Sequence, residues 1–254
     1  MHLASELQEI QPQMRDSPWA GHEHYHGYGV MVMPFSSGHL LGLRVFPDTD
    51  FGPYRSVWHR TPGGDWSIFN DGHSLDTTCP RWWGPVLKHA SLTGIDVTWT
   101  GPSVLRVTME EPQLEWTMSI SASLPLRAIN KLSAKLPSWT WKVSPLVSAR
   151  ESMAKRLLGM GDLRFTFPAP NGSSATVMCE QIYFIESSEA ILEGQSLGHP
   201  VRLPANPTIG DVALPTRPSF FVGKAYARID DPDEYRQTRE EVSRQRPELV
   251  TAGR

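Results

Sequence analysis

Short runs of alternating apolar and polar residues, each closed by a turn, are the feature that most restricts the fold of this chain. Residues 95–99, 105–109 and 114–120 place apolar side chains at every second position, and Gly101-Pro102 and Glu111-Pro112 separate the runs. Because side chains alternate between the two faces of a strand, each run presents one apolar face. Three such strands in succession predict an antiparallel meander.

Turn residues elsewhere predict further hairpins. The turn at 61–64, Thr-Pro-Gly-Gly, separates strand-like runs at 55–60 and 65–70. Pro170-Asn171-Gly172 fits the residue preference of a tight hairpin turn. The chain has 22 prolines and 20 glycines, which agrees with many short elements joined by turns.

Residues 125–158 interrupt the β pattern. Apolar residues recur there at helical spacing, and Pro137 ends the first predicted helix. Ser144 is the predicted N-cap of a second helix, and Gly159 is its predicted C-terminal stop. A charged helix is predicted near the C-terminus, over residues 232–245.

These elements predict a mainly β protein, built as an antiparallel double β-barrel or as two packed sheets, with a two-helix insert and a C-terminal helix. The 254 residues suit one large β domain or two small ones. The predicted parts are an N-terminal arm at 1–20, a first β-barrel half at 21–124, the helical insert at 125–160, a second β-barrel half at 161–229, and the C-terminal helix and tail at 230–254.

Charge, cysteines and missing motifs argue against several classes of function. The formal net charge is −3, which does not favour a nucleic-acid partner. Cys79 and Cys179 are the only cysteines, so no disulfide scaffold is expected. Neither a membrane span nor the apolar core of a signal peptide is recognisable, so we expect a cytoplasmic protein. Motifs for nucleotide phosphates, dinucleotides and serine hydrolysis are missing, and we expect no cofactor.

The stretch GHEHYHGYG places three histidines within five residues. His22 and His26 fit the letters of a zinc-hydrolase motif, but that motif lies on a helix and the flanking glycines oppose one. In an extended chain His22, His24 and His26 share one face with Tyr28. They would form hydrogen bonds at the mouth of a sheet or act as polar groups aimed into a cavity. We assign no metal ligand, and keep a metal-dependent oxygenase or hydrolase as an alternative.

A loop with the sequence DGHSLDTTCPRWWGP carries a second group of candidates. Trp82 and Trp83 offer apolar walls beside Arg81 and Asp76, which is the combination that a ligand pocket needs. Cys79 would act as a nucleophile only with a base beside it, and the sequence offers only histidines of unknown position. The alternative is that this loop packs its tryptophans over the end of the barrel.

Glu180 is the third candidate. It shares a strand face with Met178, Ile182 and Phe184, so burial there would favour the protonated carboxyl and suit a general acid. An exposed position at a sheet edge is the alternative that the sequence leaves open.

The helical insert carries seven cations and one acid, Glu151. Arg127, Lys131 and Lys135 form a stripe at every fourth position, and tryptophans lie between the two predicted helices. Such an amphipathic hairpin suits peripheral contact with an anionic membrane surface through residues 125–158, which would place the protein at the inner face of the membrane. The alternative is a solvated helix face whose tryptophans pack on the barrel.

Two stretches, VWHRTPGGDWSIFNDG at 57–72 and PNGSSATVMCEQIYFIESSEAILEG at 170–194, resemble actinobacterial proteins of unassigned function. The layout of two Trp-rich β halves with a long crossover resembles the lipocalin-like carotenoid 1,2-hydratases and Diels–Alderase-type proteins. This resemblance covers about residues 27–229 and implies a lipocalin-like double barrel around an apolar tunnel. It also implies an isoprenoid, polyketide or steroid-like ligand, with alkene protonation or cavity-directed cyclisation as the chemistry.

Together these features predict a lyase- or isomerase-type enzyme that acts on a lipophilic small molecule in a Trp-lined cavity, by acid–base or shape-directed chemistry such as hydration, isomerisation or cyclisation. The predicted catalytic residues are Asp76, Glu180, His24 and His26. The predicted substrate-binding residues are Tyr28, His59, Arg81, Trp82, Trp83, Trp116 and Tyr183. A non-catalytic carrier of a lipid or hydrophobic metabolite is the alternative, and the sequence leaves the ligand and the oligomeric state open.

Overall fold

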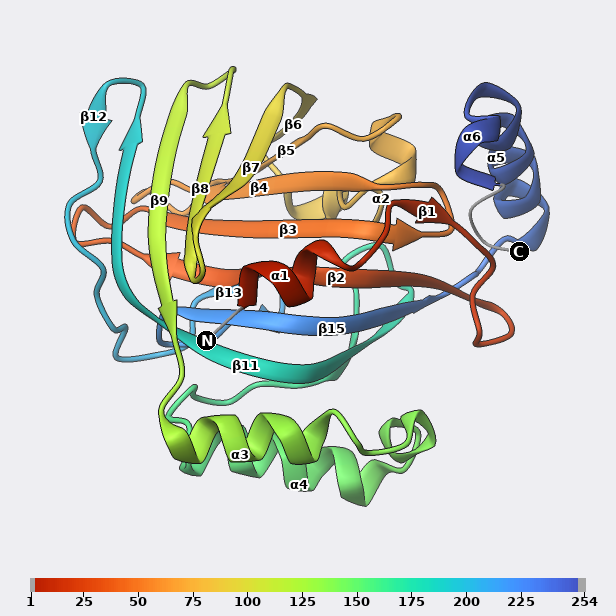
Figure 1. Ribbon diagram of the computed structural model, residues 1–254. Helices are drawn as coiled ribbons and strands as arrows, with labels where there is room; N and C mark the ends of the chain where they lie inside the picture. Colours follow the sequence, from red (N-terminus) through yellow and green to blue (C-terminus); the bar gives the residue numbers. More distant parts are fainter. Residues whose placement is uncertain (1–2, 251–254) are drawn as a thin grey trace.

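The alternating segments join edge to edge in one large curled sheet, as Figure 1 shows for the computed structural model, which describes residues 3–250. Across the sheet the strands are, in order, β6 (His89–Leu92), β5 (Trp66–Asn70), β4 (Tyr54–Arg60), β3 (Leu40–Thr49), β2 (His22–Pro34), β15 (Ser219–Arg228), β11 (Ser174–Leu192), β9 (Leu114–Ser121), β8 (Val104–Met109) and β7 (Ile95–Gly101). Shorter strands pair with this path, namely β1 (Gln13–Met14) with β3, and β10 (Thr166–Pro168) and β12 (Gln195–Ser196) with β11. A small separate ribbon contains β13 (Thr208–Ile209) and β14 (Val212–Ala213).

The prediction of a mainly antiparallel β fold is confirmed. In the described part of the chain the parallel pairs are β1 with β3 and β5 with β6. Strands β15 and β11, from the second predicted half, lie between β2 and β9 of the first half. The finer prediction of two barrels is not confirmed by this order, because strands of both halves belong to one sheet.

The inside of the curl is filled by a large apolar cluster. Trp116 on β9 and Phe220 on β15 are completely buried in it. Helix α1 (Leu3–Gln8) lies across the open side of the curl in Figure 1 and adds Leu3 and Leu7 to the same cluster. The concave face of the sheet is therefore the main packed core of the protein.

The outer face of the sheet carries a second apolar cluster, which loops cover. After η1 (Leu75–Thr77), the segments α2 (Pro80–Trp83) and η2 (Gly84–Val86) pack there, and the loop that holds β13 and β14 adds Ile209 and Leu214. The sheet thus buries apolar side chains on both faces, although only the inner face is enclosed by strands.

Three glycines let the central strands approach each other very closely. A Cβ at Gly29 of β2 would overlap the carbonyl oxygen of Leu43 on β3, and Gly27 is restricted in the same way. A Cβ at Gly223 of β15 would overlap the carbonyl oxygen of Met178 on β11. The pairing of β2 with β3 also shifts register in this region. Because bulges increase the bend and twist of a strand, these positions help to curl the sheet.

The two-helix insert is confirmed, with corrected boundaries. Helices α3 (Leu124–Ser133) and α4 (Ser144–Arg156) lie side by side next to β11 in Figure 1. The first helix ends at Ser133, with Ala134 as its C-cap, so it stops before Pro137 is reached. The predicted N-cap, Ser144, is instead the first helical residue, and Val143 takes the cap position.

A buried amide fastens the insert to the sheet. Asn130 of α3 donates from Nδ2 to the carbonyl oxygen of Ile182 at 2.8 Å and accepts at Oδ1 from the Ile182 N–H at 2.9 Å. Between the helices, η3 (Ser138–Trp141) buries Trp141 against Phe165. None of the helices within residues 3–250 has the length and apolar character needed to cross a membrane.

The predicted C-terminal helix is confirmed as α5 (Pro232–Gln245), and α6 (Pro247–Val250) follows it. The Asp231 carboxylate caps α5 by accepting from the N–H groups of Asp233 and Glu234, each at 3.0 Å.

Two strands are longer than turn signals alone would indicate. Strand β2 begins at His22, so the histidine stretch lies inside a strand. Strand β11 runs from Ser174 to Leu192 without a break, because bulges near Cys179 and Glu186 bend it without ending it.

Replacing Gly29 with alanine should lower the free energy of unfolding by about 1 to 3 kcal/mol, because the new methyl group would push β2 away from β3. Gly63→Ala is the matched control, since a Cβ there meets only the Thr61 hydroxyl at 3.6 Å. Urea unfolding of both variants measures the difference. Equal stabilities would contradict the proposed role of the close strand approach.

Candidate functional site

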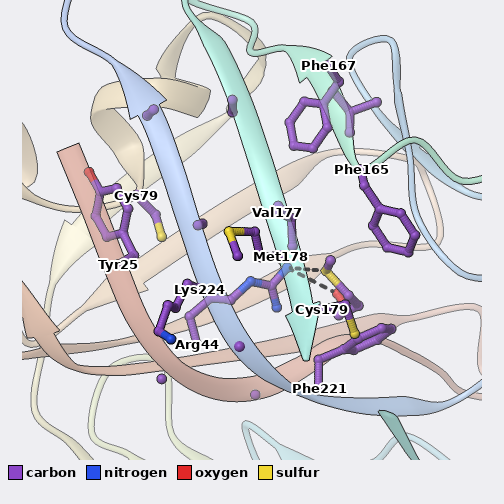
Figure 2. Close-up of a pocket in the computed structure, with 18 of the residues that line it drawn as sticks. Tyr25, Arg44, Cys79, Phe165, Phe167, Val177, Met178, Cys179, Phe221 and Lys224 are labelled. Carbon is purple, nitrogen blue, oxygen red and sulfur yellow. Dashed lines mark hydrogen bonds between the residues drawn. The ribbon is translucent and has the colours of Figure 1, made fainter. Parts of the chain in front are cut away.

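A cavity of about 170 Å³ lies between the outer face of the sheet and the loops that cover it. Small residues on adjacent strands form its floor, including Gly29 on β2, Gly223 and Ala225 on β15, and Ala175 on β11. The large apolar and aromatic side chains around it are Tyr25, Phe46, Tyr54, Trp58, Trp82, Trp83, Phe165, Phe167, Val177, Met178 and Phe221. Figure 2 shows part of this lining.

The cavity follows from the sequence of the strands that form its floor. At the centre of the floor, β2 carries Gly27 and Gly29, and β15 carries Gly223 and Ala225, in place of larger residues. Trp82 and Trp83 on α2 cover this surface without filling the space that the missing side chains leave. An apolar hollow with few polar groups is the usual form of a small-molecule site.

Three cations line this cavity, and two of them pair with acids, Arg164 with Glu151 and Lys224 with Glu180. The third, Arg44 of β3, lies at the floor. Figure 2 shows its long side chain crossing the pocket, with hydrogen bonds at the guanidinium. Its Nη1 donates to the carbonyl oxygens of Val30 at 2.5 Å and Leu43 at 2.9 Å, and the guanidinium carbon lies 4.5 Å from the Trp58 ring centre. The second terminal nitrogen, Nη2, has only long contacts of 3.4 Å to Met31. None of these partners is a carboxylate.

The charge of Arg44 is therefore poorly compensated. Burial lowers the pKa of this guanidinium to about 10, which still leaves it protonated near neutral pH. The Arg44 side chain is half-buried. Withdrawing a cation from water without a counter-ion is costly, and carbonyl dipoles and an aromatic face offset only part of that cost. A guanidinium in an apolar pocket is suited to bind a carboxylate or another planar oxyanion.

Tyr25 links the wall of the cavity to a buried carboxylate. Its hydroxyl donates to Glu23 Oε2 at 2.8 Å and accepts from Trp82 Nε1 at 2.8 Å. Glu23 also forms an ion pair with Arg81. Burial raises the pKa of Glu23 to about 7, against the lowering effects of Arg81 and Tyr25. The Tyr25 proton is thus already used, and the network holds Trp82 in position over the cavity.

The two thiols that line the cavity are neutral. Cys79 Sγ lies 3.3 Å from the Tyr54 hydroxyl. Burial raises the pKa of the Cys79 thiol and, more strongly, that of Cys179. Since the thiolate is the nucleophile, these environments do not activate either cysteine.

His24 lies outside the cavity, in a buried charge cluster near the start of β2. Its Nε2 is 3.0 Å from Asp48 Oδ1, and its Nδ1 is 3.1 Å from Asp50 Oδ2. Burial lowers the pKa of His24, but the hydrogen bonds to both carboxylates outweigh this effect and raise it above its ordinary value. The hydrogen-bonding alternative is therefore confirmed for His24. His26 adds a longer contact, 3.5 Å from Nδ1 to Asp48 Oδ2.

This cluster also holds the C-terminal helix. The Tyr235 hydroxyl of α5 donates to Asp50 Oδ1 at 2.9 Å, and Arg239 donates to the Asp50 carbonyl oxygen. Within residues 3–250, no set of three or more histidine, cysteine and acidic side chains is arranged to hold a metal ion.

The remaining predicted catalytic residues also lie outside the cavity. Asp76 is exposed on η1. Glu180 is half-buried at the bulge of β11 and accepts from Lys224 Nζ at 2.8 Å. Neither carboxylate lines the cavity.

The structure brings together three of the predicted substrate-binding residues, which are Tyr28, Trp82 and Trp83. The other four lie away from the cavity and are His59, Arg81, Trp116 and Tyr183. The ring of Tyr28 packs on Phe220 and Trp99, so its contribution to the lining is close to the main chain.

Each of the displaced residues has another partner. His59 Nε2 lies 2.8 Å from His39 Nδ1, and the two rings stack. Trp116 Nε1 donates to Ser188 Oγ at 2.8 Å inside the curl. Tyr183 donates to the side chain of Gln181 at 2.6 Å.

Sequence reasoning missed Arg44, Tyr25 and Glu23. Arg44 is a single cation within the apolar run LLGLRVF, which is the signal that could have identified it. Glu23 and Tyr25 alternate with the histidines, so they face the side of β2 opposite to the residues that drew attention.

Comparisons of the chain with protein-family models, with curated proteins and with solved structures gave no match. Function therefore has to come from the chemistry of the site.

Replacing His24 with alanine should lower the free energy of unfolding by about 3 to 5 kcal/mol, because Asp48 and Asp50 would keep buried charges without their shared partner. His22→Ala, on the same strand but with an exposed hydrogen bond to the Ala20 carbonyl oxygen, should change it by about 0.5 kcal/mol or less. Urea unfolding at neutral pH tests both. A similar effect of the two substitutions would contradict the structural role of His24.

Glu23 should make stability fall as the pH rises. The pKa of Glu23 is about 7 in the folded state and 4.5 ordinarily. Its contribution to the free energy of unfolding is therefore complete below pH 4.5 and is lost as the pH passes 7. The loss amounts to roughly 3.5 kcal/mol when the shift is converted at 1.4 kcal/mol per pKa unit. Glu23→Gln cannot ionise and should flatten this part of the profile in unfolding experiments across the range. An unchanged slope would show that Glu23 stays ionised.

Proposed function

We propose that this protein binds a small lipophilic molecule that carries an anionic group, most simply a carboxylate, in the cavity above Arg44. The observation that supports this proposal is the Arg44 guanidinium, which lies in an apolar pocket without a carboxylate partner among the described residues. A ligand carboxylate would supply the missing counter-ion, and its apolar part would contact the surrounding aromatic rings.

The size of the cavity limits the part of the ligand that it would enclose. Its volume of about 170 Å³ is close to that of the roughly 150 Å³ engineered cavity that accepts benzene. A single ring or a short branched chain, together with the anionic group, would therefore fill it.

A neighbouring groove would accommodate a longer ligand. This groove, of about 640 Å³, lies between α4 and the strands β10 and β11. Arg164, Phe167, Val212 and Ala213 line both the groove and the cavity. A lipid tail that leaves the cavity would thus continue along a surface already partly apolar.

Binding is favoured over catalysis by the state of the polar groups around the cavity. The Tyr25 hydroxyl is committed to Glu23 and Trp82, and the Cys79 and Cys179 thiols are held neutral. General acid–base catalysis needs a group that reaches the substrate in the correct protonation state. A carrier or sensor of the ligand fits these conditions better than the lyase- or isomerase-type enzyme.

The enzymatic hypothesis stays a prediction, as does the resemblance to lipocalin-like hydratases and Diels–Alderase-type proteins. Its predicted acids and bases are Asp76, Glu180, His24 and His26, and none of them lines the cavity. An isoprenoid, polyketide or steroid-like acid would still satisfy the requirement for an apolar body with an anionic group.

The test is a displacement assay with the fluorescent anion 8-anilinonaphthalene-1-sulfonate. Decanoate should displace the bound probe at much lower concentration than 1-decanol, because only the acid forms an ion pair with Arg44. Arg44→Met should weaken decanoate binding about 10- to 100-fold, since a hydrogen-bonded charge contributes about 1.5 to 3 kcal/mol. Binding of 1-decanol should be almost unchanged in the same variant.

Arg106→Met is the matched control, because Arg106 lies on β8 away from the cavity and is half exposed beside Glu115. Ala225→Leu, which fills the floor of the cavity, should weaken both ligands. Equal affinity for the acid and the alcohol in the wild-type protein, or an undiminished affinity for decanoate in Arg44→Met, would overturn the proposal.

A further inference from the structure

Exposed apolar side chains gather on the helical insert. Nine large apolar residues in the described part of the chain are exposed, and seven of them lie between residues 124 and 157. The most exposed are Leu124 (79%), Leu157 (73%), Leu132 (66%) and Trp139 (59%). We call these seven residues the hairpin patch; the other three are Leu136, Val143 and Leu146.

The hairpin patch is additional to the apolar face by which the insert packs on the protein. Leu126 of α3 and Val147 and Ala154 of α4 already point inward and are buried in the main cluster. Leu124 and Leu132 are about two helical turns apart and therefore lie on a similar side of α3, away from this buried contact. A second apolar surface on the same hairpin needs a partner outside the described chain.

Positive charge surrounds the hairpin patch. Over residues 125–158 the chain has seven cations and one acid, Glu151, which already pairs with Arg164. Lys155 pairs with Asp162. Arg127, Lys131 and Arg156 are exposed and take part in none of the ion pairs found among residues 3–250, nor does Lys135.

We propose that α3, η3 and α4 dock in the plane of an anionic membrane surface, with the leucines and Trp139 in the headgroup region and the cations on the lipid phosphates. Exposed leucine and tryptophan beside unpaired lysine and arginine are the features of an interfacial helix. A second copy of this chain is a poorer occupant, because pairing two patches would bring two strongly positive surfaces together.

The hairpin also borders the groove that leads to the cavity. Trp141, Lys142 and Val147 of the insert line one side of that groove, and Phe167 and Val212 are shared with the cavity. Docking would therefore bring the groove near the lipid from which an acidic lipophile could enter. This last step rests on the proposed ligand binding, whereas the docking itself does not.

The experiment is co-sedimentation of the full chain with vesicles of pure phosphatidylcholine or of equimolar phosphatidylcholine and phosphatidylglycerol. The protein should bind the anionic vesicles, and added salt should weaken binding. Lys131→Gln combined with Lys135→Gln should lower the partition coefficient about 25-fold, because each cation near an anionic surface contributes about a fivefold factor. Leu132→Ser combined with Leu157→Ser should lower it at least about tenfold.

Leu92→Ser combined with Ile191→Ser is the matched control, because these are the two exposed apolar residues outside the hairpin patch in the described chain. It should leave vesicle binding unchanged. Thermal melting identifies any variant that fails to fold, and the charge variant keeps the proposal testable if the leucine variant does not fold.

Decanoate affinity should stay within about twofold in the hairpin variants, so a failure of docking is distinguishable from a failure of ligand binding. Three results would overturn the docking proposal. These are no binding to anionic vesicles, equal binding to neutral vesicles, and hairpin substitutions that abolish self-association in analytical ultracentrifugation but leave vesicle binding intact.

Discussion

The close approach of neighbouring central strands, β2 to β3 and β15 to β11, is the constraint on which the rest of the structure depends. At Gly29 and Gly223 the backbone of an adjacent strand occupies the space where any other residue would place a Cβ. Because these glycines have no side chain, they also leave space on the outer face of the sheet. One local requirement thus helps to bend the sheet around its core and leaves an open floor beneath the tryptophans of α2.

The irregular pairing of β2 also explains how Arg44 is tolerated. Register shifts between Val30 and Met33 interrupt the regular ladder of β2 with β3. Arg44 donates to the Val30 carbonyl oxygen and, at longer range, to that of Met31. Carbonyl dipoles at the bulge therefore solvate the guanidinium in place of water. They leave its net charge in place, which is why the site remains suited to an anion.

The sequence was sufficient to predict the strands, the helical insert and the C-terminal helix, because period-two alternation, Pro137 and the charged run at 232–245 are local signals. It was not sufficient to predict which face of the sheet would hold a cavity. Alternation separates the two faces of β2 but does not say which one turns inward, so the histidines were considered and Glu23 and Tyr25 were not. Trp82 and Trp83, which the sequence predicted as apolar pocket walls, do line the cavity, whereas their role in substrate binding stays a prediction. Arg44 could not be predicted as a cavity residue, because the strands that form the cavity with it are far away in the sequence.

The position of β15 has a consequence for synthesis of the chain. This strand spans Ser219–Arg228, yet it lies in the middle of the sheet, between β2 and β11. Until the ribosome has made β15, β2 and β11 have unpaired backbone groups on the edges that β15 will later join. Such edges favour intermolecular pairing, and contacts between distant segments form slowly. The nascent protein therefore stays vulnerable to aggregation until β15 has emerged, and chaperones that shield strand edges would matter most for it before that point.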